Sequence, residues 1–322
     1  MSSPVLSAEA QRAKAAVLGG LVADAASLGL HWVYDQDALL ALVKGREGSP
    51  EFLEPQANKY YTHAPGTFSP YGSELFALLK AMAQDGAVDG PKLSQQLATA
   101  YTAEASNSRY LNHSSKTLVA GVSKGDSFPN SGDPADAQAN AFVKAPAVVA
   151  LYHGRPELAS KLEEAVRVQQ NNTPAVQAGV AGGLILEKVV QGHSIADALA
   201  WALKEGVITD SVKQSLQAML VEQDRPMSVT AKKLGLSCGL PHSLQVAVLA
   251  GLKFQSSYEE GVRATIIAGG DNASRNCLVG ALLAAQNGLE SIPASWRAKT
   301  LGYAEAEAAV DVLLAANAKL SA

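Results

Sequence analysis

Apolar residues recur at helical spacing along most of the chain. Within residues 75–82, leucine and methionine fall at positions i, i+3, i+4 and i+7, so they share one face of a helix. A second run, over 158–166, repeats every four residues behind Pro156, which suits the first turn of a helix. Alternating runs of β-branched and aromatic residues, typical of strands, are almost absent. The pattern predicts an all-α protein, a compact multi-helix bundle forming one domain over 1–322 with its core at about 15–310.

Local capping signals predict where several helices begin and end. Ser257 and Glu260 form a capping box in front of an apolar run. That helix should stop at Gly269-Gly270, because glycine favours helix termination. A new helix should begin at 271 or 272 and run to about 287, and a last one should span about 303–320. Small residues crowd other helices, as at Gly19-Gly20. Glycine costs roughly 1 kcal/mol against alanine inside a helix, so such positions indicate close helix crossings.

The longest polar stretch, Asn107 to Asn140, is predicted to be a long loop. Such a loop is either a functional rim or a mobile surface excursion. It contains Gly121-Val-Ser123-Lys-Gly125, which matches the nucleophile-elbow pattern of serine hydrolases. That pattern requires a strand before it and a helix directly after it. Here the sequence continues as Asp126-Ser-Phe-Pro, which is typical of a loop, so catalysis by Ser123 is disfavoured.

Composition narrows the class of protein. The chain has 322 residues, 48% hydrophobic and 17% charged, which is typical of a folded protein and unlike a disordered one. Two cysteines cannot form a disulfide framework. The formal charge is −4, and the 26 lysines and arginines are scattered among 30 acidic residues. Because nucleic-acid binding normally needs a basic stripe, we expect no nucleic-acid partner.

No segment is predicted to span a membrane. The best candidate, Ala15 to Leu30, is interrupted by Asp24 and is shorter than a typical span. Residues 1–12 lack the basic start and short apolar run of a signal peptide. With two lone cysteines, these features indicate a reducing, cytoplasmic setting and no membrane partner. The sequence leaves the oligomeric state open.

Three side chains could carry chemistry or could simply pack. Cys238 lies in a turn before an apolar helix, with His242 four residues on. Its thiol could be activated there, or it could be a small buried hydrophobe. Cys277 lies inside a predicted helix and is expected in the core. His31 stands next to Trp32 and could contact a ligand, although a satisfied core histidine is the commoner case.

The segment Ala268-Gly-Gly-Asp271-Asn-Ala-Ser274 is the most informative one for function. It is predicted as helix, glycine turn and helix, with Asp271 at the second helix's N-terminus and Ser274 one turn on. The two glycines allow backbone and ligand to approach closely. The alternative is that Asp271 only caps the helix, a role typically worth about 1 kcal/mol. General motifs such as a P-loop, zinc-type spacing or Gly-x-Gly-x-x-Gly are absent from the sequence.

Several segments together resemble the ADP-ribosylglycohydrolase family. Residues 241–271 open with Pro-His-Ser-Leu and close with Gly-Gly-Asp. With Gly280-Ala-Leu-Leu and the run 288–296, they resemble the family's C-terminal signature. Residues 19–29 resemble its opening helix, and the likeness covers roughly 15–308. The resemblance implies a compact all-α domain whose cleft holds two magnesium ions, binds ADP-ribose and hydrolyses a bond at its ribose.

The acidic positions of that family are depleted here. The family's early Thr-Asp-Asp segment aligns with Ser69-Pro70-Tyr71-Gly, which has no aspartate. In the late motif Asp271 is kept, while alanine replaces the second aspartate and Ser274 replaces threonine. Magnesium prefers octahedral oxygen coordination with carboxylates. A magnesium pair is therefore not expected, and Asp271, Ser274 and Ser69 would hold one ion weakly at most. These segments resemble the branch of J1-crystallins and the selenoprotein related to them.

Three functional hypotheses follow. The first is a divergent hydrolase acting on an ADP-ribosyl or other glycosidic small molecule, with Asp271 binding one metal or orienting water as a general base. The second is a non-catalytic crystallin-like structural or ligand-binding protein that kept the fold. The third is thiol chemistry, which requires a low pKa at Cys238. The residues expected to contact the ligand are Asp24, Tyr71, Asn272, Cys238 and His242.

Overall fold

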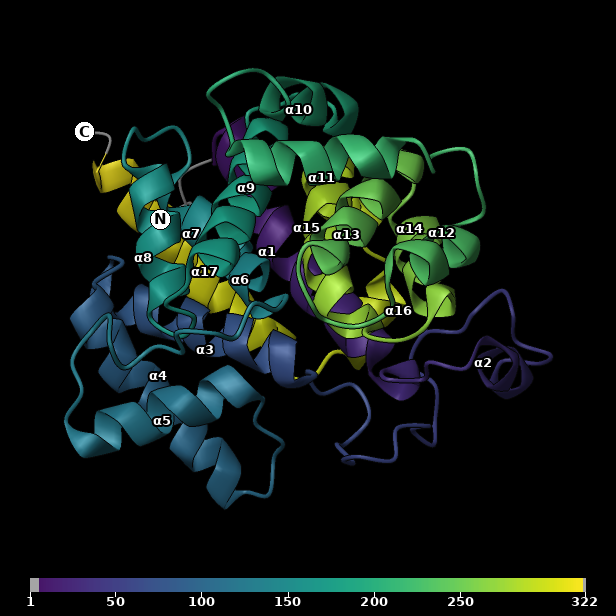
Figure 1. Cartoon of the computed structure of the whole chain (residues 1–322), viewed down its shortest axis with the longest axis horizontal. Helices are drawn as coiled ribbons and strands as arrows, with labels where there is room; N and C mark the ends of the chain where they lie inside the picture. Colours follow the sequence, from purple (N-terminus) through teal and green to yellow (C-terminus); the bar gives the residue numbers. More distant parts are fainter. Residues whose placement is uncertain (1–5, 321–322) are drawn as a thin grey trace, which may run out of the picture.

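The computed structural model describes residues 6–320, which fold into helices joined by turns and loops (Figure 1). The expectation that residues 1–12 are not a signal peptide falls partly on residues 1–5, which lie outside the described residues. Between residues 6 and 320 the remaining regular structure is three isolated bridges and no strand. The prediction of an all-α fold is confirmed. The α-helices and the two 3₁₀ helices, η1 and η2, are, in chain order, α1 (Ala8–Ser27), η1 (Leu28–Leu30), α2 (Gln36–Leu42), α3 (Pro70–Asp85), α4 (Gly90–Ser106), α5 (His113–Lys124), α6 (Asn140–Val143), α7 (Ala145–Tyr152), α8 (Leu158–Arg167), α9 (Thr173–Val190), α10 (Ile195–Ala202), α11 (Asp210–Leu220), α12 (Met227–Leu234), α13 (His242–Lys253), α14 (Tyr258–Ala268), α15 (Asn272–Asn287), η2 (Leu289–Ser291), α16 (Ala294–Lys299) and α17 (Tyr303–Leu320).

The predicted helix ends near the C-terminus are confirmed. The side chain of Ser257 caps α14 by accepting from the backbone N–H of Glu260 at 3.3 Å. The helix ends where Gly269 adopts φ +78°, a left-handed conformation that favours glycine. Helix α15 starts at Asn272, three residues after Gly269, and ends before Gly288, and α17 spans the predicted range. These ends could be predicted because capping is a local interaction.

Helices α1 and α15 cross at the centre of the molecule with their backbones in close contact (Figure 1). A Cβ atom added at Gly19 would lie 2.6 Å from the carbonyl oxygen of Gly280, and one at Gly280 would lie 2.4 Å from the carbonyl oxygen of Gly19. A Cβ at Gly20 would lie 2.6 Å from the carbonyl oxygen of Cys277. The small residues are therefore required by the crossing, as predicted. Cys277 lies fully buried at this crossing, as expected.

The first apolar helix is longer than the sequence indicated. Helix α1 and η1 together form a helical run, Ala8–Leu30, whose length and hydropathy would suit a membrane span. Within its most apolar window, 94% of the residues are buried inside the protein. The helix therefore has the environment of a central core helix, and its burial rather than its length distinguishes it from a membrane span.

The polar stretch from 107 to 140 is not one long loop, so that prediction is wrong in part. It contains α5, which the side chain of Asn112 caps by accepting from the backbone N–H of Ser115 at 3.0 Å. The hydroxyl of Ser123 donates to the carbonyl of Val119 within α5, and the residue is exposed on the helix. Ser123 therefore has neither the strand nor the turn of a nucleophile elbow.

Candidate functional site

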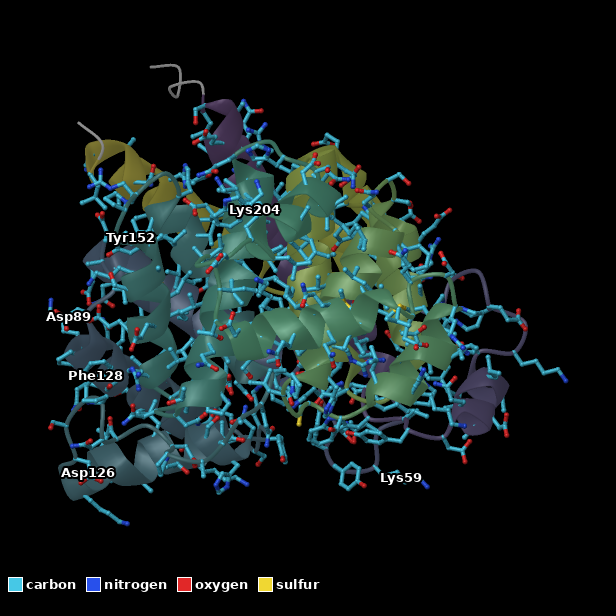
Figure 2. All side chains as sticks on the ribbon, turned by 45° about the horizontal axis from the view of Figure 1, so that its top comes forward. Lys59, Asp89, Asp126, Phe128, Tyr152 and Lys204 are labelled. Carbon is cyan, nitrogen blue, oxygen red and sulfur yellow. The ribbon has the colours of Figure 1, made fainter. Side chains whose placement is uncertain are left out.

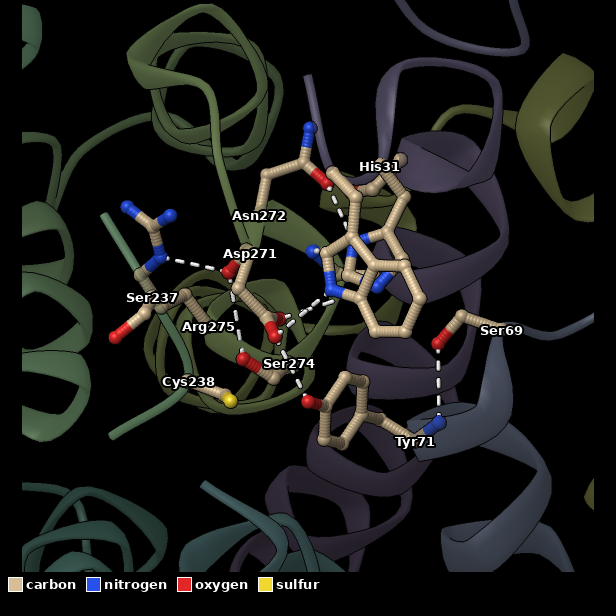
Figure 3. Close-up of polar contacts among 12 residues, drawn as sticks. His31, Ser69, Tyr71, Ser237, Cys238, Asp271, Asn272, Ser274 and Arg275 are labelled. Carbon is tan, nitrogen blue, oxygen red and sulfur yellow. Dashed lines mark hydrogen bonds and ion pairs between the residues drawn. The ribbon is translucent and has the colours of Figure 1, made fainter. Parts of the chain in front are cut away.

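Asp271 is the centre of a buried polar cluster at the start of α15. Its side chain is fully buried and makes no capping hydrogen bond to the helix, so the simple N-cap alternative is wrong. Instead, Oδ2 accepts a hydrogen bond of 2.7 Å from the hydroxyl of Tyr71 and one of 3.2 Å from Nε1 of Trp32 (Figure 3). These donors come from α3 and from the segment after η1, so three distant parts of the chain meet here.

Trp32 is held in a strained backbone conformation beside this carboxylate. Its φ is +64°, which is uncommon for a residue with a bulky side chain. Two backbone hydrogen bonds keep it there: Trp32 donates to the carbonyl of Gly270 at 2.9 Å, and Gly270 donates to Val33 at 2.7 Å. A conformation of this kind costs about 1–3 kcal/mol and is typically found at functional sites. Sequence patterns give no sign of it.

Tyr71 occupies the first turn of α3, which Ser69 caps. The hydroxyl oxygen of Ser69 accepts from the backbone N–H of Tyr71 at 3.1 Å. Burial, together with the nearby charge of Asp271, raises the pKa of Tyr71 well above its ordinary value. The phenol therefore keeps its proton and serves as a donor to Asp271.

Asp24 supports this arrangement from behind α3. Its carboxylate accepts from the backbone N–H groups of Ser69, at 2.8 Å, and Gly72, at 3.1 Å. It also accepts from the hydroxyl of Ser69. Burial raises the pKa of Asp24 to about 6, although these hydrogen bonds oppose the rise. The structure gives this predicted ligand-binding residue the role of anchoring the helix that carries Tyr71.

Arg275 places a buried positive charge next to Asp271. Its Nε donates to the backbone carbonyl of Asp271 at 2.7 Å, and a terminal nitrogen donates to the carbonyls of Gly269, at 2.6 Å, and Leu236, at 3.1 Å. Burial lowers the pKa of Arg275 to about 10, so the side chain stays charged at neutral pH. We did not predict this residue, because an arginine within a helix is normally exposed.

Asn272 orients His31. The expectation of a core histidine with satisfied hydrogen bonds is met at Nδ1 but not at Nε2. Nδ1 of His31 lies 3.1 Å from Oδ1 of Asn272. The amide nitrogen of Asn272 donates to the carbonyls of Leu30 and Ile266, which fixes its oxygen toward the imidazole. The N–H of Ala273 also approaches Nδ1, at the longer distance of 3.3 Å. Nδ1 cannot carry a proton and also accept from Ala273, so we assign its proton from the shorter contact, the one to Asn272, which leaves Nε2 as an acceptor.

The second nitrogen of His31 faces the second oxygen of Asp271. Nε2 and Oδ1 lie 4.0 Å apart, and within residues 6–320 neither atom has a hydrogen-bond partner. Burial lowers the pKa of His31, so its imidazole is neutral at neutral pH. Two buried acceptors without a donor are unusual in folded proteins. The pair indicates a place for a donor such as water or a ligand group.

Cys238 lies at this site, but its thiol is not activated. Sγ donates to Oε1 of Gln138 at 2.9 Å, and the sulfur lies beside the hydroxyl of Tyr71 (Figure 3). Burial and the charge of Asp271 raise the pKa of Cys238 to about 12. His242 pairs with Ser237 at 2.8 Å instead of with the cysteine. The low pKa required for thiol chemistry is therefore contradicted.

The residues do not fit a magnesium pair. Oδ2 of Asp271 already accepts from two donors, and the hydroxyl of Ser274 donates to the backbone carbonyl of Asp271 at 3.3 Å. The hydroxyl of Ser69 donates to Asp24, so the three oxygens proposed for one ion do not converge. Among the described side chains, no group of three or more His, Cys, Asp and Glu could hold a metal. The negative charge of Asp271 is balanced by the positive charge of Arg275 and by the hydrogen bonds that Tyr71 and Trp32 donate.

Aromatic rings cover the cluster on its outer side. Trp32 stacks on His31 with ring centroids 5.1 Å apart, and it meets Tyr60, Tyr61 and Tyr110 edge to face at 5.3–5.5 Å. Trp32 is half-buried, whereas Tyr60 is 71% exposed. Such rings provide large apolar contact areas and prefer edge-to-face geometry. These aromatic rings therefore extend from the buried cluster to the protein surface.

Comparisons with known proteins agree with the sequence resemblance. The sequence model of the ADP-ribosylglycohydrolase family matches residues 6–321. Crystallin J1A of Tripedalia cystophora is 31% identical over 301 residues, covering 90% of this chain and 92% of that protein. Crystallin J1B of the same organism is 30% identical over 302 residues, with the same coverage. A solved chain described as an ADP-ribosylglycohydrolase-related protein complex matches in fold, with a TM-score of 0.70 at 19% identity, covering 96% of this chain and 99% of that chain.

Proposed function

Because the chain belongs to the ADP-ribosylglycohydrolase family, we propose that it hydrolyses an ADP-ribosyl or other glycosidic small molecule without a magnesium pair. The observation that supports this proposal is the facing pair of Asp271 Oδ1 and His31 Nε2, both buried and both without a donor. Trp32 and Cys238, which are half-buried, lie beside Asp271. We expect a ligand to approach over these two side chains.

The separation of the two acceptors suits one water molecule. With Oδ1 and Nε2 4.0 Å apart, a single water can donate one hydrogen bond of ordinary length to each. Such a water has its lone pairs directed away from both acceptors. Asp271 would then act as a general base, and His31 would orient the water.

The proposed reaction is the hydrolysis of a glycosidic bond. The water oxygen forms a bond to the anomeric carbon while the bond from that carbon to the leaving group breaks. Oδ1 of Asp271 takes one proton of the water, the departing group takes up a proton from solvent, and Asp271 then returns its proton to solvent. Tyr71 and Trp32 keep their hydrogen bonds to Oδ2 during this step and hold the carboxylate in place.

Turnover in the absence of metal tests the proposal. Purified protein is incubated with ADP-ribosyl substrates in EDTA and, separately, in excess Mg²⁺. We expect hydrolysis in both, and a loss of about 10²–10⁴-fold in Asp271→Asn, as for removal of a general base. Asp37→Asn, an exposed carboxylate on α2, is the matched control and should keep full activity. Equal turnover by wild type and Asp271→Asn would refute the proposed role.

A non-catalytic, crystallin-like protein is the second candidate. It is favoured by the complete burial of Asp271 and His31 and by the likeness to two crystallins. A purely structural protein should show no thermal shift with nucleotides or sugars. Ligand at 100-fold above its Kd should stabilise the folded state by about 2.7 kcal/mol. A shift of that size with ADP-ribose would exclude the purely structural version.

A further inference from the structure

A cavity lined in part by Trp32 adjoins the covered cluster. It has a volume of about 580 Å³, within the usual range for small-molecule sites. Helix α2 stands off the main helical body in Figure 1, and the cavity lies between this helix and the segment around Tyr60. Its main lining residues are Trp32, Tyr34, Ala38, Leu42, Ala57 and Tyr60.

The lining of this cavity is aromatic and aliphatic, and much of it is exposed. Tyr34 is 43% exposed, Leu42 is 44% exposed and Tyr60 is 71% exposed. Large apolar side chains are rarely left open together without a partner. The ring of Tyr60 meets Trp32 edge to face, with centroids 5.5 Å apart. A planar aromatic ring bound in this cavity would therefore contact apolar side chains and the edges of aromatic rings.

The charges around the cavity do not suit a diphosphate. Lys59 is the one cationic side chain among the described residues that line it, and it lies at the edge of the molecule in Figure 2. The carboxylate of Asp35 also lines it, and Oδ1 accepts from the backbone N–H of Ala38 at 3.0 Å to cap α2. A pyrophosphate group needs several donors or positive charges. An uncharged ring fits this lining better.

Trp32 belongs to both sites. Its indole N–H bonds Oδ2 of Asp271, and its side chain also lines the cavity. We propose that this cavity binds the planar aromatic aglycone of a glycoside whose sugar reaches Asp271. The inference rests on the proposed function, since it assigns the substrate class of the same site: aryl or nucleobase glycosides without a phosphate requirement.

Ligand binding followed by tryptophan fluorescence tests the inference. The probes are ribose, adenosine, 4-nitrophenyl riboside and ADP-ribose. We expect the two uncharged aromatic ribosides to bind at least about tenfold more tightly than ribose, and ADP-ribose to gain nothing over adenosine. The nitrophenyl ring should quench Trp32, and Trp32→Phe should remove that quenching while Trp201 and Trp296 remain.

Helix α2 offers a matched pair of variants. Leu42 lines the cavity, whereas Leu40, on the same helix, is 50% exposed and does not line it. Leu42→Ala should weaken binding of the aromatic ribosides several-fold, Tyr60→Ala should weaken it by about tenfold, and Leu40→Ala should leave it unchanged.

The outcomes separate this inference from the proposed hydrolysis. Binding that depends on Leu42, without release of 4-nitrophenol, would support the cavity and contradict the hydrolase. Turnover of ADP-ribosyl substrates with no preference for aromatic ribosides would overturn the cavity alone. An absence of quenching, or equal effects of Leu42→Ala and Leu40→Ala, would also overturn it.

Discussion

The hydroxyl of Tyr71 donates a 2.7 Å hydrogen bond to Oδ2 of Asp271, across 200 residues of sequence. The sequence resemblance predicts that Tyr71 stands in the segment that corresponds to the family's acidic metal-binding segment. On that prediction a neutral phenol would stand where the family has a carboxylate, and in the structure it donates to Asp271. Burial raises the pKa of Tyr71, which keeps it a donor at neutral pH.

Tyr71→Phe should lower the free energy of unfolding by about 1–3 kcal/mol, because it removes a donor from a buried carboxylate. Urea denaturation followed by circular dichroism measures this change. Tyr60→Phe is the control, since Tyr60 is 71% exposed. Equal stability of the two variants would show that the hydrogen bond to Asp271 contributes nothing.

Restoring the family's acidic residues should create dependence on magnesium. Excess Mg²⁺ is expected to leave the melting temperature of the wild type unchanged, because Oδ2 of Asp271 already accepts from two donors. In Pro70→Asp/Tyr71→Asp/Ala273→Asp, the ion should stabilise the fold, by about 2.7 kcal/mol at 100-fold above Kd. Calorimetric titration of both proteins measures the binding. Tight binding of Mg²⁺ by the wild type would contradict the conclusion that its residues do not fit a magnesium pair. This test does not depend on whether the triple variant folds.

Asp24 predicts a specific dependence of stability on pH. Burial raises its pKa from 3.8 to about 6, so the folded state holds this proton more tightly than the unfolded state. Its contribution to stability is greatest below pH 4 and is lost as the pH rises through 6. The fall is on the order of 3 kcal/mol for a shift of this size. Urea titrations between pH 4 and 7 measure the free energy of unfolding, which should fall less with rising pH in Asp24→Asn than in the wild type. Parallel pH dependence of the two proteins would contradict the raised pKa of Asp24.

The crossing of α1 and α15 predicts a large effect of one methyl group. Gly280→Ala should destabilise the protein by about 1–3 kcal/mol or more, because its Cβ would lie 2.4 Å from the carbonyl oxygen of Gly19. Gly48→Ala is the matched control, since nothing lies within 4 Å of a Cβ there. Thermal unfolding compares the two variants. If Gly280→Ala lost no more stability than Gly48→Ala, the prediction would be contradicted, because α1 and α15 could then move apart without an energetic cost.

Local features of the fold could be predicted from sequence, whereas the site could not. The cap at Ser257 and the stop at Gly269 depend on neighbouring residues, so both ends of α14 were predicted. Helix α5 is not predicted by the apolar pattern, because its sequence is mostly polar and resembles a loop. The bond from Trp32 to Asp271 joins residues 239 apart, and no spacing rule indicates it. The burial of Arg275 likewise depends on carbonyls supplied by the tertiary fold.

The position of α15 against α1 also has a consequence for biosynthesis. The face of α1 that carries Gly19 and Gly20 is covered by a helix that ends at Asn287. A ribosome must therefore make most of the chain before this apolar surface can be buried. During that time the nascent chain exposes one of its most hydrophobic segments, which is a natural target for chaperones and a risk for aggregation. Fragments ending before α15 should consequently be insoluble when expressed alone.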